Sequence, residues 1–214
     1  RLVWDTRRQQ LIYSNQVLFG TIRNCSGGYS PWGWLSCEET SQDNHGYVFL
    51  TDPHARSIID PQPIKSYGRF MHEAALVNPR TLRAYLTEDR QDGCFYRFVP
   101  SQRDNPFQGV LQALKIEGED SIDTNQLEAG AQFKVTWVSI RDPNPKKDTV
   151  RYQAQDLGAT TFSRGEGICS DGREVFFTCA SGGPMKAGQV FALKINSHSD
   201  DNLRLVYQSE DKTR

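Results

Sequence analysis

The sequence has no long hydrophobic run, and no apolar stretch approaches the roughly 20 residues that a membrane-spanning helix needs, so no membrane span is expected. It also has almost no net charge, because 25 lysines and arginines face 26 aspartates and glutamates. A protein that binds nucleic acid or an anionic membrane surface normally carries a basic excess, so neither partner is expected. The first residues show neither the hydrophobic core nor the cleavage site of a secretory signal.

Several common catalytic and metal-binding motifs are also missing. There is no G-x-S-x-G elbow, no H-E-x-x-H helix and no P-loop, which argues against the usual serine hydrolases, zinc peptidases and P-loop nucleotide hydrolases. The five cysteines contain no C-x-x-C pair, so neither a zinc finger nor an obvious disulfide framework is expected. Four of them are expected to be small buried hydrophobes: Cys37, Cys94, Cys169 and Cys179. Cys25 differs because it lies beside serine and glycine.

Aromatic and β-branched residues are plentiful, and they predict an all-β protein. Four tryptophans, eight tyrosines and eleven phenylalanines favour a packed globular chain. Short apolar runs separated by Gly, Pro, Asn and Asp are typical of strands. These runs lie at 11–13, 17–19, 47–50, 83–86, 95–99, 111–116, 133–138, 174–178, 190–193 and 203–207. Only residues 148–157 have the pattern of a short helix.

An internal repeat organises these strands. Three segments share one pattern, a strand followed by a polar loop and a second strand that begins with glycine: 34–50, 84–98 and 175–193. Their leading glycines, Gly46, Gly93 and Gly188, are separated by 47 and 95 residues, which is one period and about two. A period of this length is typical of the four-stranded blade of a β-propeller.

The number of repeats predicts an incomplete propeller. The 214 residues hold about four and a half such units, and a propeller must close on itself to avoid open sheet edges. We therefore expect residues 1–214 to form a single, partial β-propeller domain. It is either a fragment of a longer propeller, the interpretation that we favour, or an unusually small one. A short helical insertion is expected near residues 142–160.

The residues just before each repeated strand pair predict a metal site. Cys25, Glu73 and Glu166 are separated by 48 and 93 residues, again one and two periods, so they should converge on the propeller axis. Inward carboxylates without matching lysines repel one another unless they are protonated or bind cations. Oxygen ligands suit Ca²⁺ or Mg²⁺, whereas a thiolate suits a softer transition metal. A single glutamate on a strand is more often a solvated residue, and the regular spacing weighs against that interpretation here.

Other polar residues could complete this site. Four acidic residues close the strands of the first two repeats and would add negative charge: Glu38, Glu39, Glu88 and Asp89. A turn-forming role is equally compatible with Glu88 and Asp89. Arg164 lies two residues before Glu166, on the same side of an extended strand, where it would pair with a carboxylate or hold an anionic substrate oxygen.

Six motifs together resemble the PhoX-type alkaline phosphatases over nearly the whole chain. The longest is 24–39, NCSGGYSPWGWLSCEE, followed by GRFMHEAA at 68–75 and YLTED at 85–89. YRFVP at 96–100, RGEGI at 164–168 and GQVF at 188–191 extend the match. The Pro-Trp-Gly turn is one residue shorter than in the family pattern. The acidic segments expected after Gln208 are missing, which implies an incomplete set of metal ligands.

This resemblance implies a β-propeller with an iron- and calcium-containing centre that hydrolyses small phosphate monoesters in the periplasm or outside the cell. A monomer is expected. The family pattern implies that Cys25 binds iron and that Glu39, Glu73 and Glu166 are further metal ligands. It also implies a calcium-ligand role for Asp89 and a catalytic role for Arg164.

Two other functions remain compatible with the residues. One is a non-catalytic propeller that binds a partner and uses the metal as a structural plug. The other is a calcium-dependent, lactonase-like propeller that hydrolyses a neutral ester. Each keeps the same acidic residues, so the motifs do not separate them from a phosphatase.

Overall fold

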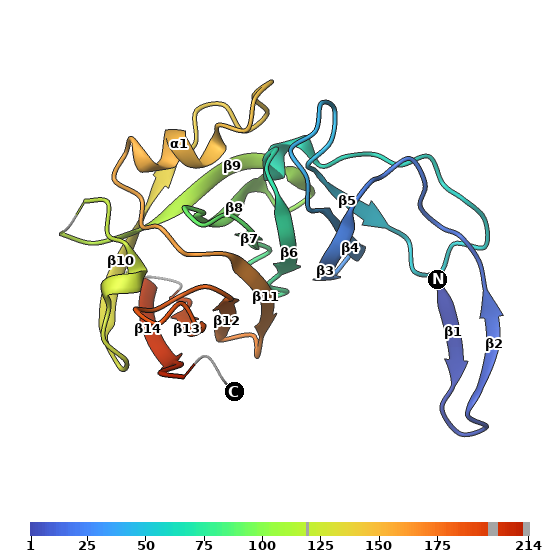
Figure 1. Cartoon of the computed structure of the whole chain (residues 1–214). Helices are drawn as coiled ribbons and strands as arrows, with labels where there is room; N and C mark the ends of the chain where they lie inside the picture. Colours follow the sequence, from blue (N-terminus) through green and yellow to red (C-terminus); the bar gives the residue numbers. More distant parts are fainter. Residues whose placement is uncertain (119, 197–200, 212–214) are drawn as a thin grey trace.

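The computed structural model describes residues 1–118, 120–196 and 201–211, and nearly all of its regular structure is antiparallel β-sheet (Figure 1). The all-β prediction is therefore confirmed. The strands are β1 Leu2–Asp5, β2 Gln10–Ser14, β3 Asn24–Ser30, β4 Gly33–Glu38, β5 Val48–Thr51, β6 His72–Val77, β7 Ala84–Glu88, β8 Phe95–Gln102, β9 Asn105–Ile116, β10 Gln132–Ser139, β11 Gly165–Ser170, β12 Glu174–Cys179, β13 Gln189–Lys194 and β14 Asp201–Gln208. The helical elements are α1 Val150–Gln155 and two 3₁₀ turns, η1 Lys65–Tyr67 and η2 Thr124–Gln126. None of the helices described is long and apolar enough to cross a membrane.

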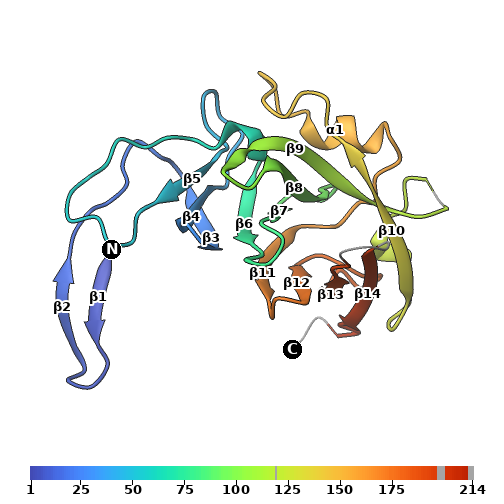
Figure 2. The ribbon, with the colours of Figure 1, turned by 180° about the vertical axis from the view of Figure 1, so that it is seen from behind.

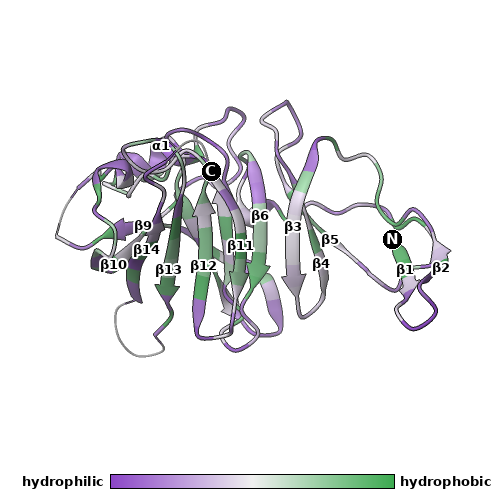
Figure 3. Ribbon diagram, turned by 60° about the horizontal axis from the view of Figure 1, so that its bottom comes forward, coloured by the Kyte–Doolittle hydropathy of each residue, from purple (hydrophilic) through white to green (hydrophobic). Residues whose placement is uncertain are grey.

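The strands form three sheets. β3, β4 and β5 make a three-stranded sheet, and nine strands make a large one in the order β11-β12-β13-β14-β10-β9-β8-β7-β6. The β1–β2 hairpin projects away from both, as the view from behind shows (Figure 2). The large sheet curls until its two ends lie near each other, and the Thr87 hydroxyl on β7 donates to the Glu166 carbonyl on β11 at 2.6 Å. Strands β11, β6 and β3 consequently lie side by side (Figure 3).

The strand predictions are mostly correct. Nine of the ten apolar runs fall on strands, but residues 17–19 form no strand, and the predicted helix at 148–157 contains α1. The three repeated strand pairs are β4–β5, β7–β8 and β12–β13, all antiparallel. The segments before them, which the sequence analysis singled out for the metal site, are β3, β6 and β11. Glycine and serine in β3 and β11, and alanine and glutamate in β6, are not typical strand residues, so their composition does not indicate strands.

An aromatic stack fills the space enclosed by the large sheet. Phe95 on β8 stacks on Phe177 of β12 with ring centroids 4.0 Å apart, and Phe177 stacks on Phe191 of β13 at 5.2 Å. All three side chains are buried. They join strands that are distant in sequence, so this packing stabilises the curled shape that brings β6 and β11 together.

The cysteine prediction is correct for three of four residues. Cys37, Cys94 and Cys179 are buried, as expected, whereas Cys169 on β11 is exposed. The expectation for Cys169 is wrong because alternate residues of a strand face opposite sides, and this position faces outward. Cys25 is also exposed.

Gly28 allows β3 to approach β6 closely. A Cβ atom at this position would lie 1.9 Å from the carbonyl oxygen of Ala75 on β6. The two strands are not paired within one sheet, so only the missing side chain permits this contact. The contact matters because Cys25 lies on β3 and Glu73 on β6.

Replacing Gly28 with alanine is expected to push β3 away from β6 and to lower the free energy of unfolding by about 1–3 kcal/mol, the usual cost of overpacking. Urea denaturation followed by tryptophan fluorescence would measure the change. The matched control is Gly167→Ala on β11, where the nearest atom to a new Cβ would be 3.9 Å away. Equal stability of Gly28→Ala and the control would contradict the proposed crowding.

Candidate metal centre

Three strands carry the same backbone irregularity at the same place. In β3, β6 and β11, three steps along the strand match two steps along its partner, which is β4, β7 or β12. This mismatch is the signature of a β-bulge. The shifts lie between Asn24 and Gly27 in β3, between His72 and Ala75 in β6, and between Gly165 and Ile168 in β11. Cys25, Glu73 and Glu166 are the first residues inside these bulges. Because bulges redirect side chains, the repeat places three potential ligands in equivalent orientations.

Cys25, Glu39 and Glu73 form a compact cluster. One potential ligand atom from each lies within 4.8 Å of the others. The Cys25 thiol donates a hydrogen bond to Oε1 of Glu73 at 3.3 Å. Glu73 is buried, Glu39 half-buried and Cys25 exposed, so the cluster opens to solvent on the β3 side. A thiol with two carboxylates at this spacing is a suitable donor set for a transition metal.

Arg164 and two carboxylates form the neighbouring part of the site. The Arg164 guanidinium binds both oxygens of Asp89, with Nε 2.7 Å from Oδ1 and Nη2 2.9 Å from Oδ2. Its Nη2 also lies 3.0 Å from Oε1 of Glu166. The sequence predicted this nearness from an extended strand, which is wrong in detail: Arg164 precedes β11 and has a left-handed φ of 58°. Such a conformation is uncommon for a residue with a side chain and persists only where the surrounding structure holds it.

The pKa values of the cluster reflect crowded negative charge. Burial raises the pKa of Glu73, and the charges of Glu166, Glu39 and Asp89 raise it further, although the hydrogen bond from Cys25 opposes them. Burial and Asp89 likewise raise the pKa of Glu166. Burial and then Glu73 raise the pKa of the Cys25 thiol to about 12. A bound cation would reverse each of these shifts, because it favours the charged form of every ligand.

Glu38 points away from this cluster, although the sequence grouped it with Glu39. It is fully buried and accepts hydrogen bonds from the backbone N–H of Gly46 at 2.8 Å, of Ile22 at 3.0 Å and of Tyr47 at 3.2 Å. Nδ1 of His45 lies 2.7 Å from its Oε1. Glu38 therefore holds the loop between β4 and β5, and the expectation that it adds charge to the site is wrong.

Glu88 has the equivalent position in the second repeat and the same role. It accepts hydrogen bonds from the Cys94 N–H at 3.1 Å and the Tyr96 hydroxyl at 2.8 Å. Burial raises its pKa to about 7, although these hydrogen bonds and Arg151 oppose the shift. The turn-forming alternative is thus the better description of Glu88, whereas its neighbour Asp89 binds Arg164 in the site.

Sequence reasoning missed Arg23, which borders the cluster. Its Nε donates to the Glu39 carbonyl at 3.0 Å, its Nη2 lies 3.7 Å from Glu39 Oε2, and its own φ is 48°. An arginine just before the Asn-Cys motif was the available signal. Among the described residues, two cations, Arg23 and Arg164, form ion pairs with carboxylates of the site. The site has four carboxylates and therefore retains an excess of negative charge: Glu39, Glu73, Asp89 and Glu166.

The comparisons with known proteins agree on one family. The model of the family described as alkaline phosphatase PhoX matches residues 7–213. Among solved structures, the chain is similar to Pseudomonas fluorescens PhoX in complex with vanadate, a transition state analogue, with a TM-score of 0.64 and 20% identity. The match covers 87% of this chain but 47% of that one, so the chain spans about half its length. No curated protein sequence matches the chain.

Proposed function

Since the chain belongs to the PhoX alkaline phosphatase family, we propose that the protein of which it forms part hydrolyses phosphate monoesters in a metal-dependent reaction. The observation that carries this proposal is the cluster of Cys25, Glu39 and Glu73, whose ligand atoms lie within 4.8 Å of one another beside Arg164. The vanadate complex of the related structure supports it, because vanadate imitates a phosphoryl group in transfer.

The fold proposal is a β-propeller in which β3, β6 and β11 are the inner strands of successive blades. β6–β9 and β11–β14 would each be a four-stranded blade, and β10 would join their outer edges. The equivalent bulges and the side-by-side inner strands support this arrangement (Figure 3). We propose that the part of a PhoX-length protein that this chain does not match supplies the further blades that close the propeller. As for the family, we propose a monomer located in the periplasm or outside the cell.

The donor set fits iron and calcium. Cys25 offers the thiolate that iron accepts, and Glu39, Glu73 and Glu166 offer carboxylates that suit either metal. The crowding of carboxylates around the buried Glu73 supports a cation at this place, because the charges of Glu166, Glu39 and Asp89 add to burial in raising its pKa. Asp89 would complete a calcium site at the edge of the cluster while it also orients Arg164.

When bound, these metals would supply Lewis acidity toward phosphoryl oxygens. The protein's own contribution is to place a guanidinium beside them. Asp89 fixes Arg164 with two hydrogen bonds, and among the described residues its Nη1 has no partner. That nitrogen is therefore available to a phosphoryl oxygen, where a preorganised donor stabilises the charge that develops during transfer.

Metal removal tests the proposal directly. The full-length protein should contain iron and calcium by mass spectrometry, and a chelator should lower turnover of p-nitrophenyl phosphate at least about 100-fold, since a bound metal typically contributes several kcal/mol. Restored activity after metal is added back would control for unfolding. Calcium alone with hydrolysis of neutral esters would favour the lactonase-like alternative. The absence of both iron and hydrolysis would favour the non-catalytic binding module.

A further inference from the structure

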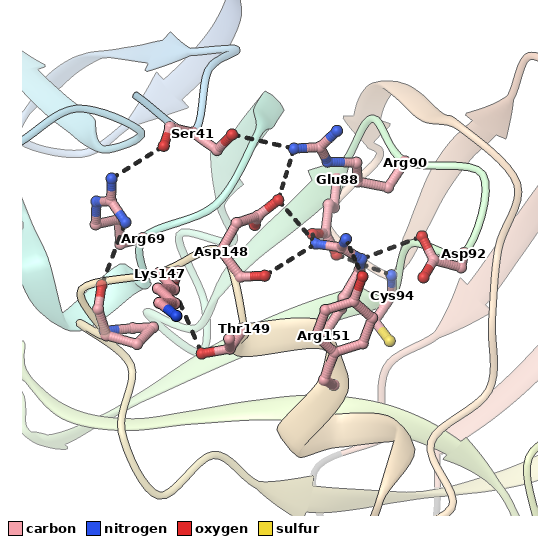
Figure 4. A network of polar contacts seen from close by, with 12 residues as sticks. Ser41, Arg69, Glu88, Arg90, Asp92, Cys94, Lys147, Asp148, Thr149 and Arg151 are labelled. Atoms are coloured by element: carbon pink, nitrogen blue, oxygen red, sulfur yellow. Dashed lines mark hydrogen bonds and ion pairs between the residues drawn. The ribbon is translucent and has the colours of Figure 1, made fainter. Parts of the chain in front are cut away.

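A network of four charged residues lies behind the metal-site loops and connects them to the α1 segment (Figure 4). We call it the brace and define it as Arg69, Arg90, Asp148 and Arg151. None of these residues belongs to the metal cluster, and only Arg69 lies in one of the six motifs, GRFMHEAA at 68–75, where it has no assigned role. Arg69 and Arg151 are buried, and Arg90 and Asp148 are half-buried. So many charged groups removed from water are costly unless each has a specific partner.

Asp148 is the centre of the brace. Its Oδ2 lies 2.6 Å from Nη2 of Arg90 and 2.9 Å from Nη1 of Arg151. Arg151 continues the network to Asp92, with its Nε 3.1 Å from Oδ1, and its Nη1 lies 3.7 Å from Oε1 of Glu88. One carboxylate thus holds two arginines that would otherwise repel each other.

The brace spans the loops that carry two site residues. Arg90 directly follows Asp89, and its Nη2 donates a hydrogen bond to the Ser41 hydroxyl at 3.1 Å. Ser41 comes two residues after Glu39. Among the described residues, no backbone hydrogen bond joins 39–42 to 89–93, because β4 and β7 belong to different sheets. The side chains of the brace therefore make the direct polar link between the two loops.

Arg69 fastens the first loop to the α1 segment from the other side. Its Nη2 donates to the Ser41 carbonyl at 3.1 Å, and its Nη1 donates to the carbonyls of Lys146 at 3.0 Å and Pro145 at 3.3 Å. The side chain is almost fully buried, at 3% exposed. Only a planar fork of donors reaches two separate chain segments in this way, which lysine cannot do. Residues 145–151 thus bind the 89–93 loop directly and the 39–42 loop through Arg69 and Arg90.

We propose that Asp148 is a positioning residue, which through Arg90 sets the spacing between Glu39 and the Asp89–Arg164 pair. The α1 insertion is then a support for the metal site. Without the carboxylate, Arg90 would lose its ion pair and Arg151 would keep only Asp92 and Glu88 as partners. The 39–42 and 89–93 loops would then separate. The part of this inference that concerns metal retention rests on the proposed function, whereas the part that concerns loop spacing does not.

The test compares Asp148→Asn with Asp156→Asn in the full-length protein. Asp156 is exposed, lies at the end of α1 and makes no ion pair among the described residues, so it matches the charge change. Hydrogen exchange of peptides covering 39–43 and 89–93 should become about tenfold faster in Asp148→Asn and stay unchanged in the control. The amounts of iron and calcium that stay bound during dialysis against increasing chelator concentrations should also decrease in Asp148→Asn. Asp148→Glu should partly restore both the slow exchange and the metal retention.

Unchanged exchange in both peptides would overturn the proposed loop spacing, and faster exchange with full metal retention would overturn the proposed support of the metal site. If Asp148→Asn does not fold, Ser41→Ala removes only the link between the loops and should give a smaller change of the same kind. Should the wild-type protein hold no metal and hydrolyse no phosphate ester, the proposed function fails, and the exchange measurement alone decides whether the brace spaces the loops.

Discussion

Replacing Cys25 with serine is expected to remove the bound iron and to lower phosphatase activity at least about 100-fold, since even groups that only support a metal ligand typically contribute 10–100-fold. A serine hydroxyl keeps its proton in this acidic surrounding, whereas a cysteine thiol loses its proton to solvent when a transition metal binds, and the thiolate is the ligand. Iron content by mass spectrometry and turnover of p-nitrophenyl phosphate should decrease in proportion. Calcium content should change less, because the carboxylates remain in place.

The chain provides a matched control for this experiment. Cys169 is the other exposed cysteine, and it lies on the inner strand β11 three residues beyond Glu166. Cys169→Ser should leave both iron content and turnover unchanged. Full activity of Cys25→Ser at full iron loading would remove Cys25 from the mechanism. Equal losses in both variants would show that the effect does not depend on the place of Cys25 in the cluster.

The convergence of the site could be predicted from spacing alone. Cys25, Glu73 and Glu166 recur at one and two repeat periods, and a repeated strand arrangement places equivalent residues at equivalent points in space. The structure adds the local cause, which is a bulge at the same step of β3, β6 and β11. A bulge has no simple sequence signature. The repeat period could therefore be predicted from the sequence, whereas the bulges that orient the side chains could not.

The directions of neighbouring acidic residues could not be predicted. Glu38 and Glu39 are adjacent, as are Glu88 and Asp89, yet the first of each pair turns inward to hold a loop and the second faces the site. Adjacent residues of a strand face opposite sides, but which side is the site depends on register. Register is set by pairing with distant strands, which the local sequence does not contain.

The brace could not be predicted either, because it too depends on contacts between distant parts of the chain. Arg90 and Asp148 are 58 residues apart, and the link between them depends on how the α1 segment folds back over the strand ends. Charged residues in a polar loop ordinarily indicate solvent exposure, so such residues are not expected to be partly buried. Their partial burial arises only from tertiary packing, and it is the observation from which we proposed that they support the site.

Replacing Arg164 with lysine is expected to lower kcat about 100- to 1,000-fold, the usual cost of losing one preorganised donor at the reacting group. Lysine keeps the positive charge but has no fork with which to hold both oxygens of Asp89 while a further nitrogen faces substrate. Iron and calcium contents should stay near their wild-type values, since a cation is no metal ligand. That combination separates a role in catalysis from a role in metal binding.

Arg173→Lys is the control for the lysine substitution, because Arg173 is exposed in the turn between β11 and β12, away from the carboxylate cluster. It should keep the wild-type kcat. If Arg164→Lys also kept it, Arg164 would serve only to neutralise Asp89 and Glu166, and the transition state would depend on the metals alone. If instead metal were lost together with activity, the left-handed Arg164 would be a structural link of the cluster, and the catalytic donor would have to be another group.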